Sequence, residues 1–309
     1  MAMVSRTCPL CGSADRSQVF AEEAYDPRQL GQFAFASRKL PEYMHYRLML
    51  CARCDLLYAS PAPEPKNLAE AYLSAAYDST LESRYAARTY ARIMRQMLGR
   101  LCDRAGALDI GAGDGAFLKE LQAYGFTEVI GVEPSAAPID AAEDAVRPLI
   151  RHGQFSLQDL QGRQFRLVTC FQTLEHVDDP LRVCRDAYAL LKEEGAMMCV
   201  VHNRFAWSAK MLGRRSPIYD IEHLQLFSRR SARLLLETAG FRNVRTAVVL
   251  NCYPANYWIR LLPLPLRIKK AVIAAAGATG VGRIPAVLPA GNLAVFGFKP
   301  TSGVATGRI

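Results

Sequence analysis

Four cysteines in two closely spaced pairs are the first residues whose types and spacing could do chemistry. The pairs are Cys8-Pro-Leu-Cys11 and Cys51-Ala-Arg-Cys54, and 39 residues separate them. Two such pairs supply four thiolates, a full ligand set for tetrahedral zinc with no position left for a substrate. We therefore predict a structural Zn²⁺ on these four cysteines. Four unrelated free thiols are the alternative, because the intervening loop is longer than in a compact zinc ribbon.

A second group with chemical potential is the stretch Leu-Asp-Ile-Gly-Ala-Gly-Asp-Gly at 108–115. Glycines after a strand let the backbone approach a ligand closely and expose amide groups at a helix start. Glu133 follows about 20 residues later, as in the dinucleotide fingerprint. Spacing alone therefore fits either a dinucleotide or S-adenosylmethionine (SAM).

Charge separates these two cofactors. A dinucleotide would place an anionic pyrophosphate against Asp109 and Asp114, and like charges in a partly desolvated site repel. SAM has no phosphate, and its methionine end offers an ammonium that a carboxylate can bind. Glu133 can accept both ribose hydroxyls in either case. Asp109 therefore favours the sulfonium cofactor.

Two Glu-His pairs, Glu175-His176 and Glu222-His223, follow expected strand ends that should face this cofactor. A histidine beside a carboxylate can take a proton near neutral pH, so either could be the general base for an acceptor. Each pair could instead shape a loop or cap a helix; we favour that role for His176 and leave both roles open for His223. The candidate catalytic residues are His223, Glu222, His176, Tyr219 and the lid residue Tyr77.

The elements that must position these residues alternate between strand-like and helix-like patterns from residue 105 onward. Such alternation indicates a parallel sheet with helices on both faces. We predict an α/β fold with a doubly wound, mostly parallel seven-stranded Rossmann-like sheet. Strands are expected at 107–111, 128–133, 165–171, 195–201, 244–250 and 291–300, with a short one near 148–151. Helices are expected at 115–124, 136–145, 180–192 and 229–239.

Three regions are expected along the chain. Residues 1–65 form a zinc-binding module and a proline-rich linker, and 66–104 form a helical connector or lid with a break near 77–79. Residues 105–309 form the SAM-binding domain, with an apolar insertion at 253–289. Within it, 257–289 could be an interfacial helix pair that meets a lipid-linked substrate, since it carries Arg260, Arg267, Lys269 and Lys270. A dimer contact or a cover on the sheet edge is the favoured reading, and repeated prolines argue against one long helix.

The net charge of +9 invites a nucleic-acid interpretation. The densest basic group is Arg84, Arg88, Arg92 and Arg95, whose spacing makes one stripe on a helix. We favour the interpretation that this stripe is a solvated helix face, and a site for a phosphate-bearing substrate is the alternative. The sequence shows no signal peptide and no apolar run long enough to span a membrane, so we expect a cytoplasmic protein.

The run from 107 to 203 resembles the class I SAM-dependent methyltransferases, through LDIGAGDG, VIGVEPS, FRLVTCFQTLEHVDDP and LLKEEGAMMCVV. The resemblance extends to EHLQLFSRRSARLLLETAGF at 222–241 and to GNLAVFGFKP. It implies that Glu133 holds the ribose, that Phe171 and Gln172 flank the sulfonium, and that Asp109 and the glycines line the methionine end. The family usually has an acidic residue near the adenine, where this chain has Gln154, and Asp159 is the other candidate. The cofactor residues implied are Asp109, Gly111, Ala112, Gly113, Gly115, Glu133, Pro134, Gln154, Phe155, Phe171 and Gln172.

The N-terminal segments CPLCGS, CARCDLLYASPAP and AYLSAAYDS resemble the module on a branch of these enzymes that includes C-methyltransferases of nucleotide-linked deoxysugars. The resemblance implies a module that covers the substrate and does not react. In that branch a Tyr and a Glu-His precede the same helix start, and here the match is partial because Asp220 and Ile221 intervene.

Together these features predict SAM-dependent methylation, on oxygen or carbon, of a small-molecule or sugar-containing acceptor in natural-product or glycan biosynthesis. An RNA methyltransferase is the alternative, suggested by the basic charge and the zinc module. Against it, the strand near 165–171 is followed by FQTLEH and not by an NPPY-type motif that would stack a flipped base. A non-catalytic cofactor-binding protein is disfavoured by the intact glycine stretch. A homodimer is left open.

Overall fold

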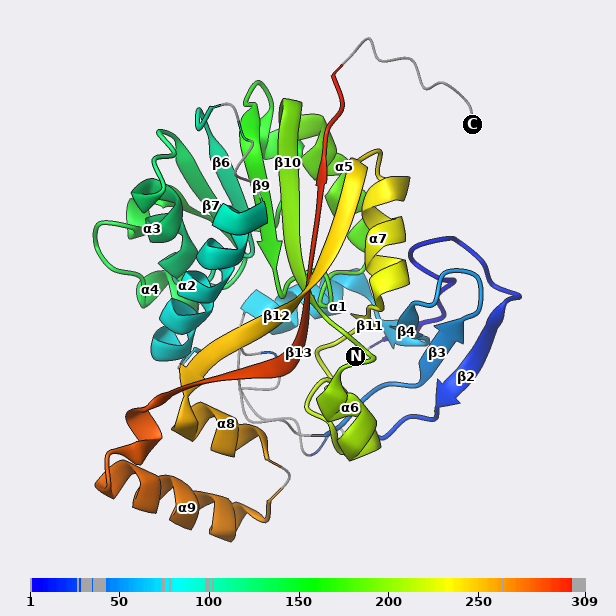
Figure 1. The fold of residues 1–309 in the computed structure, drawn as a ribbon. Coiled ribbons are helices and arrows are strands. Elements are labelled where there is room, and N and C mark those ends of the chain that lie inside the picture. The colour runs from blue at the N-terminus through cyan, green and yellow to red at the C-terminus, as the bar shows by residue number, and fades with distance from the viewer. Residues whose placement is uncertain are drawn as a thin grey trace.

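The computed structural model describes residues 2–26, 28, 35, 43–73, 76–77, 79–97, 101, 103–262 and 264–301, and a seven-stranded sheet lies at its centre (Figure 1). The strand order is β12-β13-β10-β9-β6-β7-β8. β13 runs antiparallel to both neighbours, and the other pairs are parallel. The strands are β6 (Ala107–Ile110), β7 (Val129–Glu133), β8 (Ile150–His152), β9 (Phe165–Phe171), β10 (Leu191–His202), β12 (Arg242–Pro254) and β13 (Pro285–Phe298). The predicted α/β fold with a mostly parallel sheet is confirmed.

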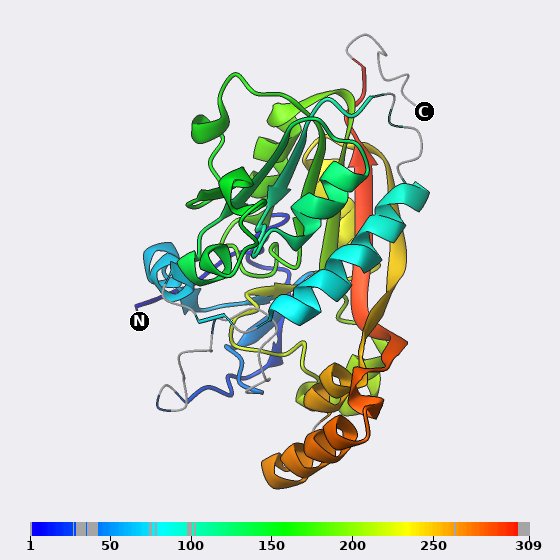
Figure 2. The ribbon, with the colours of Figure 1, turned by 90° about the vertical axis from the view of Figure 1, so that its left-hand side faces the viewer.

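Helices cover both faces of this sheet (Figures 1 and 2). One face packs against α5 (Pro180–Leu190) and α7 (Arg229–Thr238), and the other packs against α2 (Thr80–Met97) and α3 (Ala116–Ala123). The central strands are buried on both sides, and for that reason β6 and β9 read as nearly continuous apolar runs. This is the doubly wound arrangement that the alternating pattern predicts.

Two helix ends differ from the prediction. α4 (Ala136–Asp140) stops five residues before the expected end, because turn hydrogen bonds from Ala142 N to Ile139 O and from Val146 N to Glu143 O replace the helical ones. α5 ends at Leu190, and the next residue already pairs with Phe165 as the first residue of β10. Leu191 is fully buried there, so strand pairing and burial override the local helix pattern.

The N-terminal residues form a second, smaller sheet beside the large one. β2 (Ser17–Ala21), β3 (Leu48–Cys51) and β4 (Leu57–Ala59) are antiparallel, and β4 also pairs with β11 (Gln225–Leu226) from the far end of the chain. The proline-rich stretch at 60–65 is not an exposed linker, because β5 (Ala62–Pro63) pairs with β1 (Met3–Val4) and Ala62 is fully buried. Residues 27, 29–34 and 36–42 of the expected module lie outside the described residues.

The predicted helical connector consists of α1 (Pro65–Leu73) and α2. The expected break falls in the interval between them, of which residues 74, 75 and 78 lie outside the described part.

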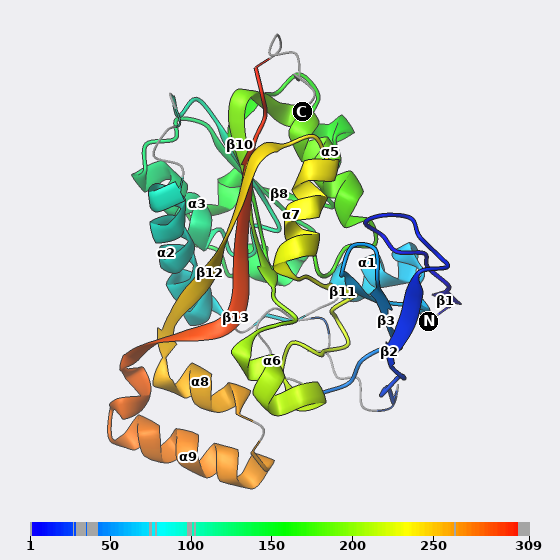
Figure 3. The same ribbon diagram turned by 45° about the vertical axis from the view of Figure 1, so that its right-hand side comes forward.

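The apolar insertion continues the β12–β13 ladder past the edge of the large sheet. It contains two helices, α8 (Ala255–Leu261) and α9 (Leu266–Ala278), which project from one end of the molecule (Figures 2 and 3). The expectation that prolines prevent one long helix is met. No helix in the described ranges is both long and apolar enough to cross a bilayer.

Candidate functional site

A cavity of about 940 Å³ lies at the carboxyl ends of β6, β7, β9 and β10. Ligands of open α/β sheets bind at this edge, and the volume suits a small-molecule ligand. The lining includes nearly every residue assigned to the cofactor: Asp109, Gly111, Ala112, Gly113, Glu133, Pro134, Gln154, Phe155, Phe171 and Gln172.

The glycine loop between β6 and α3 forms one wall of the cavity. Gly113 has φ of +56°, and a Cβ atom there would meet no heavy atom within 4 Å, so the backbone is bare where a ligand would approach. Gly115 has a different function. It caps α3 outside the cavity lining, and a Cβ would come within 2.4 Å of Val146 Cγ1. Gly115 therefore provides close packing and not a ligand contact.

Glu133, at the end of β7, is 8% exposed and fastens the loop. One carboxylate oxygen accepts from Gly113 N at 2.9 Å, and the other accepts from Ser135 N at 2.9 Å. Burial raises the pKa of Glu133 in spite of these bonds. Each oxygen keeps a lone pair for a further donor.

Asp109, at the base of the cavity, is 3% exposed. Its Oδ1 accepts from Thr169 Oγ at 2.7 Å. Burial raises the pKa of Asp109 to about 7, with the hydrogen bond from Thr169 opposing the shift and Glu133 adding to it. A cationic ligand would restore its charge, so the site is suited to an ammonium group.

The adenine and sulfonium candidates lie on opposite sides of the loop. Gln154 and Phe155 line the cavity after β8. Gln172, with φ of +49°, follows β9 and accepts a hydrogen bond from Tyr90 OH at 3.0 Å. The Phe171 ring packs against Tyr90 with centroids 4.8 Å apart. α2 therefore closes the cavity over the end of β9.

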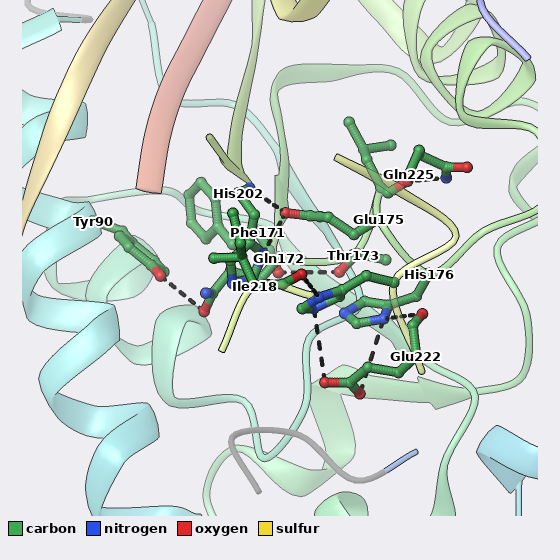
Figure 4. A network of polar contacts seen from close by, with 12 residues as sticks. Tyr90, Phe171, Gln172, Thr173, Glu175, His176, His202, Ile218, Glu222 and Gln225 are labelled. Atoms are coloured by element: carbon green, nitrogen blue, oxygen red, sulfur yellow. Dashed lines mark hydrogen bonds and ion pairs between the residues drawn. The ribbon is translucent and has the colours of Figure 1, made fainter. Parts of the chain in front are cut away.

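The Glu-His pairs predicted from sequence come together in one cluster. Figure 4 shows Glu175, His176 and Glu222 of this cluster. Nδ1 of His223 lies 2.8 Å from the Ile218 carbonyl oxygen. Since a carbonyl only accepts, Nδ1 must carry the proton, which leaves Nε2 as the basic nitrogen. That Nε2 lies 3.8 Å from a Glu222 carboxylate oxygen. His223 thus has the tautomer and the neighbouring carboxylate that a general base requires.

His176 lies on the other side of the same carboxylate, 4.0 Å from Glu222 Oε2. Its Nδ1 contacts Tyr72 OH at 2.8 Å and the backbone carbonyl of Glu222 at 3.1 Å. Burial raises the pKa of Tyr72 well above its ordinary value, so the phenol stays neutral. These contacts all fall on Nδ1 and fix that edge of the His176 ring, whose centroid lies 5.1 Å from that of His223.

Sequence reasoning missed a third histidine in this cluster. His202, at the end of β10, lines the cavity, and its ring packs against that of His223 in a tilted arrangement with centroids 4.5 Å apart. Fully buried Glu175 accepts from His202 N at 2.5 Å and from its Nδ1 at 2.8 Å. Although burial raises it, these contacts hold the pKa of Glu175 below its usual value. The position of His202 at a strand end was the available signal.

The tyrosines that line the cavity are not all the ones predicted. Tyr77 and Tyr72 line the cavity, and Tyr72 was not predicted. Tyr219 does not line it; its ring stacks on Phe20 at 6.1 Å within the core that α6 (Trp207–Leu212) shares with the N-terminal strands. The geometry gives Tyr219 a packing position, so we leave it out of the chemistry.

The four predicted zinc ligands lie together in the N-terminal sheet. Cys8 Sγ is 3.4 Å from Cys54 Sγ, Cys11 Sγ is 3.5 Å from Cys51 Sγ, and all four sulfurs fall within 4.8 Å of one another. Tetrahedral zinc with bonds of about 2.3 Å sets its sulfurs about 3.8 Å apart, so the spacing fits. The hydrogen bond with Cys54 lowers the pKa of Cys8 to about 5. His176, Glu222 and His223 also offer ligand atoms within 4.8 Å, at wider spacing.

Fold and cavity define an α/β enzyme that binds a small cationic cofactor over a glycine loop. The family model described as "Methyltransferase domain" matches residues 82–246, more than half of the chain. The chain therefore belongs to the class I SAM-dependent methyltransferases.

Similar proteins include two ubiquinone biosynthesis O-methyltransferases. The one from Histophilus somni is 31% identical over 118 residues, which are 34% of this chain and 49% of that protein. The one from Haemophilus ducreyi is 34% identical over 107 residues, 31% of this chain and 45% of that protein. The chain thus spans about half the length of the curated relatives it matches.

Similar solved structures include a possible histamine N-methyltransferase from Thermotoga maritima, with 19% identity and a TM-score of 0.47. It aligns over 72% of this chain and 92% of its own. The plantazolicin methyltransferase BpumL in complex with SAH has 14% identity and a TM-score of 0.46. That alignment covers 77% of this chain and 91% of the other.

Proposed function

We propose that the protein transfers a methyl group from SAM to an oxygen or carbon of a small-molecule or sugar-containing acceptor in natural-product or glycan biosynthesis. The observation that carries this proposal is the cavity itself. It joins the glycine loop and Asp109 at one end to His223, with its basic Nε2, at the other. The O-methyltransferase activity in the names of the two relatives supports an oxygen acceptor.

The residues fit the cofactor. SAM supplies an electrophilic methyl group on a positively charged sulfur. Asp109 would bind the ammonium, Glu133 would accept the ribose hydroxyls, and Gln154 and Phe155 would border the adenine. Phe171 and Gln172 would border the sulfonium, since they follow β9 at the centre of the sheet edge. Their main contribution is alignment and exclusion of water.

The acceptor proton is assigned to His223. Nε2 takes the proton from the acceptor while Nδ1–H stays bonded to the Ile218 carbonyl. The imidazolium that forms is stabilised by the Glu222 carboxylate 3.8 Å away. His176 would hold Glu222 in place from the other side, and Tyr77 would cover the site from the connector at 66–104.

We further propose that Zn²⁺ binds Cys8, Cys11, Cys51 and Cys54 in a structural site. Support comes from the sulfur spacing and from burial, since all but Cys11 are buried. The ion would order the module at 1–65, whose strands lie beside the acceptor end of the cavity through β4 and β11.

The basic stripe on α2 gives the RNA alternative little support. Two arginines of the basic stripe are partnered, Arg84 with Glu143 at 3.2 Å and Arg95 with Glu120 at 3.2 Å. The stripe is thereby partly neutralised.

Methyl-labelled SAM tests the proposal. The protein is incubated with labelled SAM and, in turn, a nucleotide-linked deoxysugar, a polyprenyl phenol and an unmodified RNA. Label should enter one of the small molecules, and His223→Ala should abolish most of that transfer while SAM binding persists. Transfer to the RNA alone would contradict the acceptor class.

A further inference from the structure

The end of the molecule that carries α6 (Trp207–Leu212), α8 and α9 is apolar and basic. We name it the basal surface and define it as residues 205–215, 255–262 and 264–284. Its elements lie together at one end of the ribbon (Figures 1 and 3). The basal surface and the adjoining ends of β12 and β13 line one part of the cavity, and the glycine loop lines another part.

Large apolar side chains on the basal surface are exposed to an unusual degree. Trp207 is 67% exposed, Met211 63%, Ile284 57% and Ile268 52%. Most described residues of α9 are exposed, because α9 packs mainly against α8 and against the short 3₁₀ turn that follows α9. Exposed apolar patches of this kind mark interaction sites.

The charged residues that the segments of the basal surface contribute have one sign. The sequence contains no Asp or Glu after Glu237, and none from 203 to 217. Arg267, Lys270 and Arg283 are exposed, and none of them forms an ion pair with a described residue. Exposed basic side chains also follow Trp207 on α6 and its 3₁₀ turn: Lys210, Arg214 and Arg215.

The other two cations have internal functions, which shows that the helix pair is built as a unit. Arg260 reaches back to Glu82 of α2 at 3.2 Å. Lys269 is 6% exposed and donates to the Arg260 carbonyl at 2.9 Å, joining α9 to the end of α8. Trp258 Nε1 donates to the Ala286 carbonyl at 3.0 Å, fixing α8 to β13. The projecting helices are thus held in place while their outer side chains stay exposed.

The lining of the cavity reaches this same end. Its apolar members there include Trp207, Met211 and Trp258, and the first two belong to the most exposed apolar side chains of the basal surface. Leu261 and Leu288 add to this lining, and Ser208, Asn251 and Asn292 are its polar members. A mostly apolar stretch of lining, which we call the apolar passage, therefore extends from the exposed surface toward the histidine cluster.

We propose that the basal surface docks on an anionic lipid membrane. Apolar side chains flanked only by cations match a lipid interface, where the former enter the acyl boundary and the latter meet anionic headgroups. A protein partner or a second copy would also bury the apolar residues. The uniformly positive charge, however, makes one copy repel another. On the proposed methyl-transfer function, this docking turns the apolar passage toward the bilayer and selects an acceptor that carries an apolar chain.

Vesicle sedimentation with the full chain tests the docking. The protein should bind vesicles of phosphatidylglycerol mixed with phosphatidylcholine, bind weakly to phosphatidylcholine alone, and lose binding as salt is added. Each cation near an anionic surface strengthens binding about fivefold. Loss of two cations alone weakens binding about 25-fold, and Arg267→Glu/Lys270→Glu also adds two repelled carboxylates, so it should weaken binding by at least that factor. The matched control Arg88→Glu/Arg92→Glu, on α2, has the same charge change and should bind nearly as wild type. Equal losses in both variants, or no binding to anionic vesicles, would overturn the proposal.

Tryptophan fluorescence locates the contact. Trp207→Phe leaves Trp258 as the single tryptophan, and Trp258→Phe leaves Trp207. Brominated lipids should quench the exposed Trp207 strongly and the partly buried Trp258 less. Light scattering tests the alternative that a second copy of the chain binds the basal surface. If the wild-type protein is a dimer that dissociates in Ile268→Ser/Val272→Ser, the surface is a dimer interface, and lipid docking is contradicted. SAM binding in the absence of vesicles is a separate readout, so failure of the docking leaves the proposed function standing.

Discussion

The two ends of the cavity use carboxylates in opposite ways. At the cofactor end, buried Asp109 and Glu133 have raised pKa values, because burial removes their carboxylates from water and hydrogen bonds offset this only in part. At the acceptor end, Glu175 is equally buried, yet His202 keeps its pKa low. The first arrangement needs a cation from outside, and the second holds an internal pair in place. From this difference we expect one end to bind a charged ligand and the other to take part in proton transfer.

The largest expected effect concerns the module beside the acceptor end. Elemental analysis of protein purified without chelator should give about one zinc per chain, since four thiolates make one closed site. Cys54→Ser should lose the metal and expose residues 1–65 to hydrogen exchange, because structural zinc supplies about 10 kcal/mol or more of folding free energy. Cys184→Ser, a buried cysteine of α5 outside the quartet, is the control. Full zinc retention in the Cys54 variant would refute the site.

At the acceptor end, the general base should show the next largest effect. His223→Ala should lower turnover roughly 10²–10⁴-fold with little change in SAM affinity, because no cofactor contact is assigned to it. His176→Ala should instead lower stability, since it breaks the contact with buried Tyr72. Turnover with the identified acceptor and calorimetric SAM affinity separate the two. Near-normal turnover of His223→Ala would mean that another group takes the proton.

The cofactor end gives a smaller effect in affinity. Asp109→Ala and Glu133→Ala should each weaken SAM binding by about 1–3 kcal/mol, the cost of removing a charge-assisted hydrogen bond. Calorimetry measures both. Asp159→Ala, an exposed residue near the adenine candidates, should bind SAM as wild type does. If that variant alone lost affinity, the adenine assignment would move from Gln154 to Asp159.

The raised pKa of Asp109 predicts a pH dependence. Below about pH 7 the empty site holds a proton that an ammonium must displace, so SAM affinity should fall as pH drops from 8 to 6, by up to about tenfold per unit. Folding stability has the opposite sign. The folded state binds the proton more tightly than the unfolded chain, so burial of Asp109 costs stability as pH rises from about 4 to 7.

The Asp109→Asn variant distinguishes the effect of pH on SAM affinity from its effect on folding stability. It should weaken SAM binding at pH 8 and remove its pH dependence, while raising the melting temperature of the empty protein at that pH. A variant that lost both affinity and stability would show that the carboxylate is needed structurally.

The smallest effect is expected for Tyr219. Because its ring packs against Phe20 outside the cavity, Tyr219→Phe should change turnover less than about twofold and stability by under about 0.5 kcal/mol. A large loss of turnover would return Tyr219 to the chemistry.

Whether a feature could be predicted from the sequence depends on how far apart its residues lie along the chain. The glycine loop and Glu133 lie within 26 residues of one another in a strand-loop-helix-strand unit, so their spacing carries the information. The four cysteines could be predicted as a metal site from their residue type and their paired spacing. The cluster at the acceptor end is different, because it combines Tyr72, His176, His202 and Glu222. These residues become neighbours only once the fold has positioned α1, β9, β10 and β11, and no local sequence pattern predicts that. The early end of α5 has the same origin, since Leu191 becomes a strand residue only when it pairs with Phe165.

Calorimetric titration of the wild-type protein with SAM, and separately with NAD, tests the central claim most directly. The carboxylates at 109 and 133 predict micromolar SAM binding, stronger at pH 8 than at pH 6, and no measurable NAD binding. Tight NAD binding with no response to SAM would contradict the assignment of this cavity to a sulfonium cofactor.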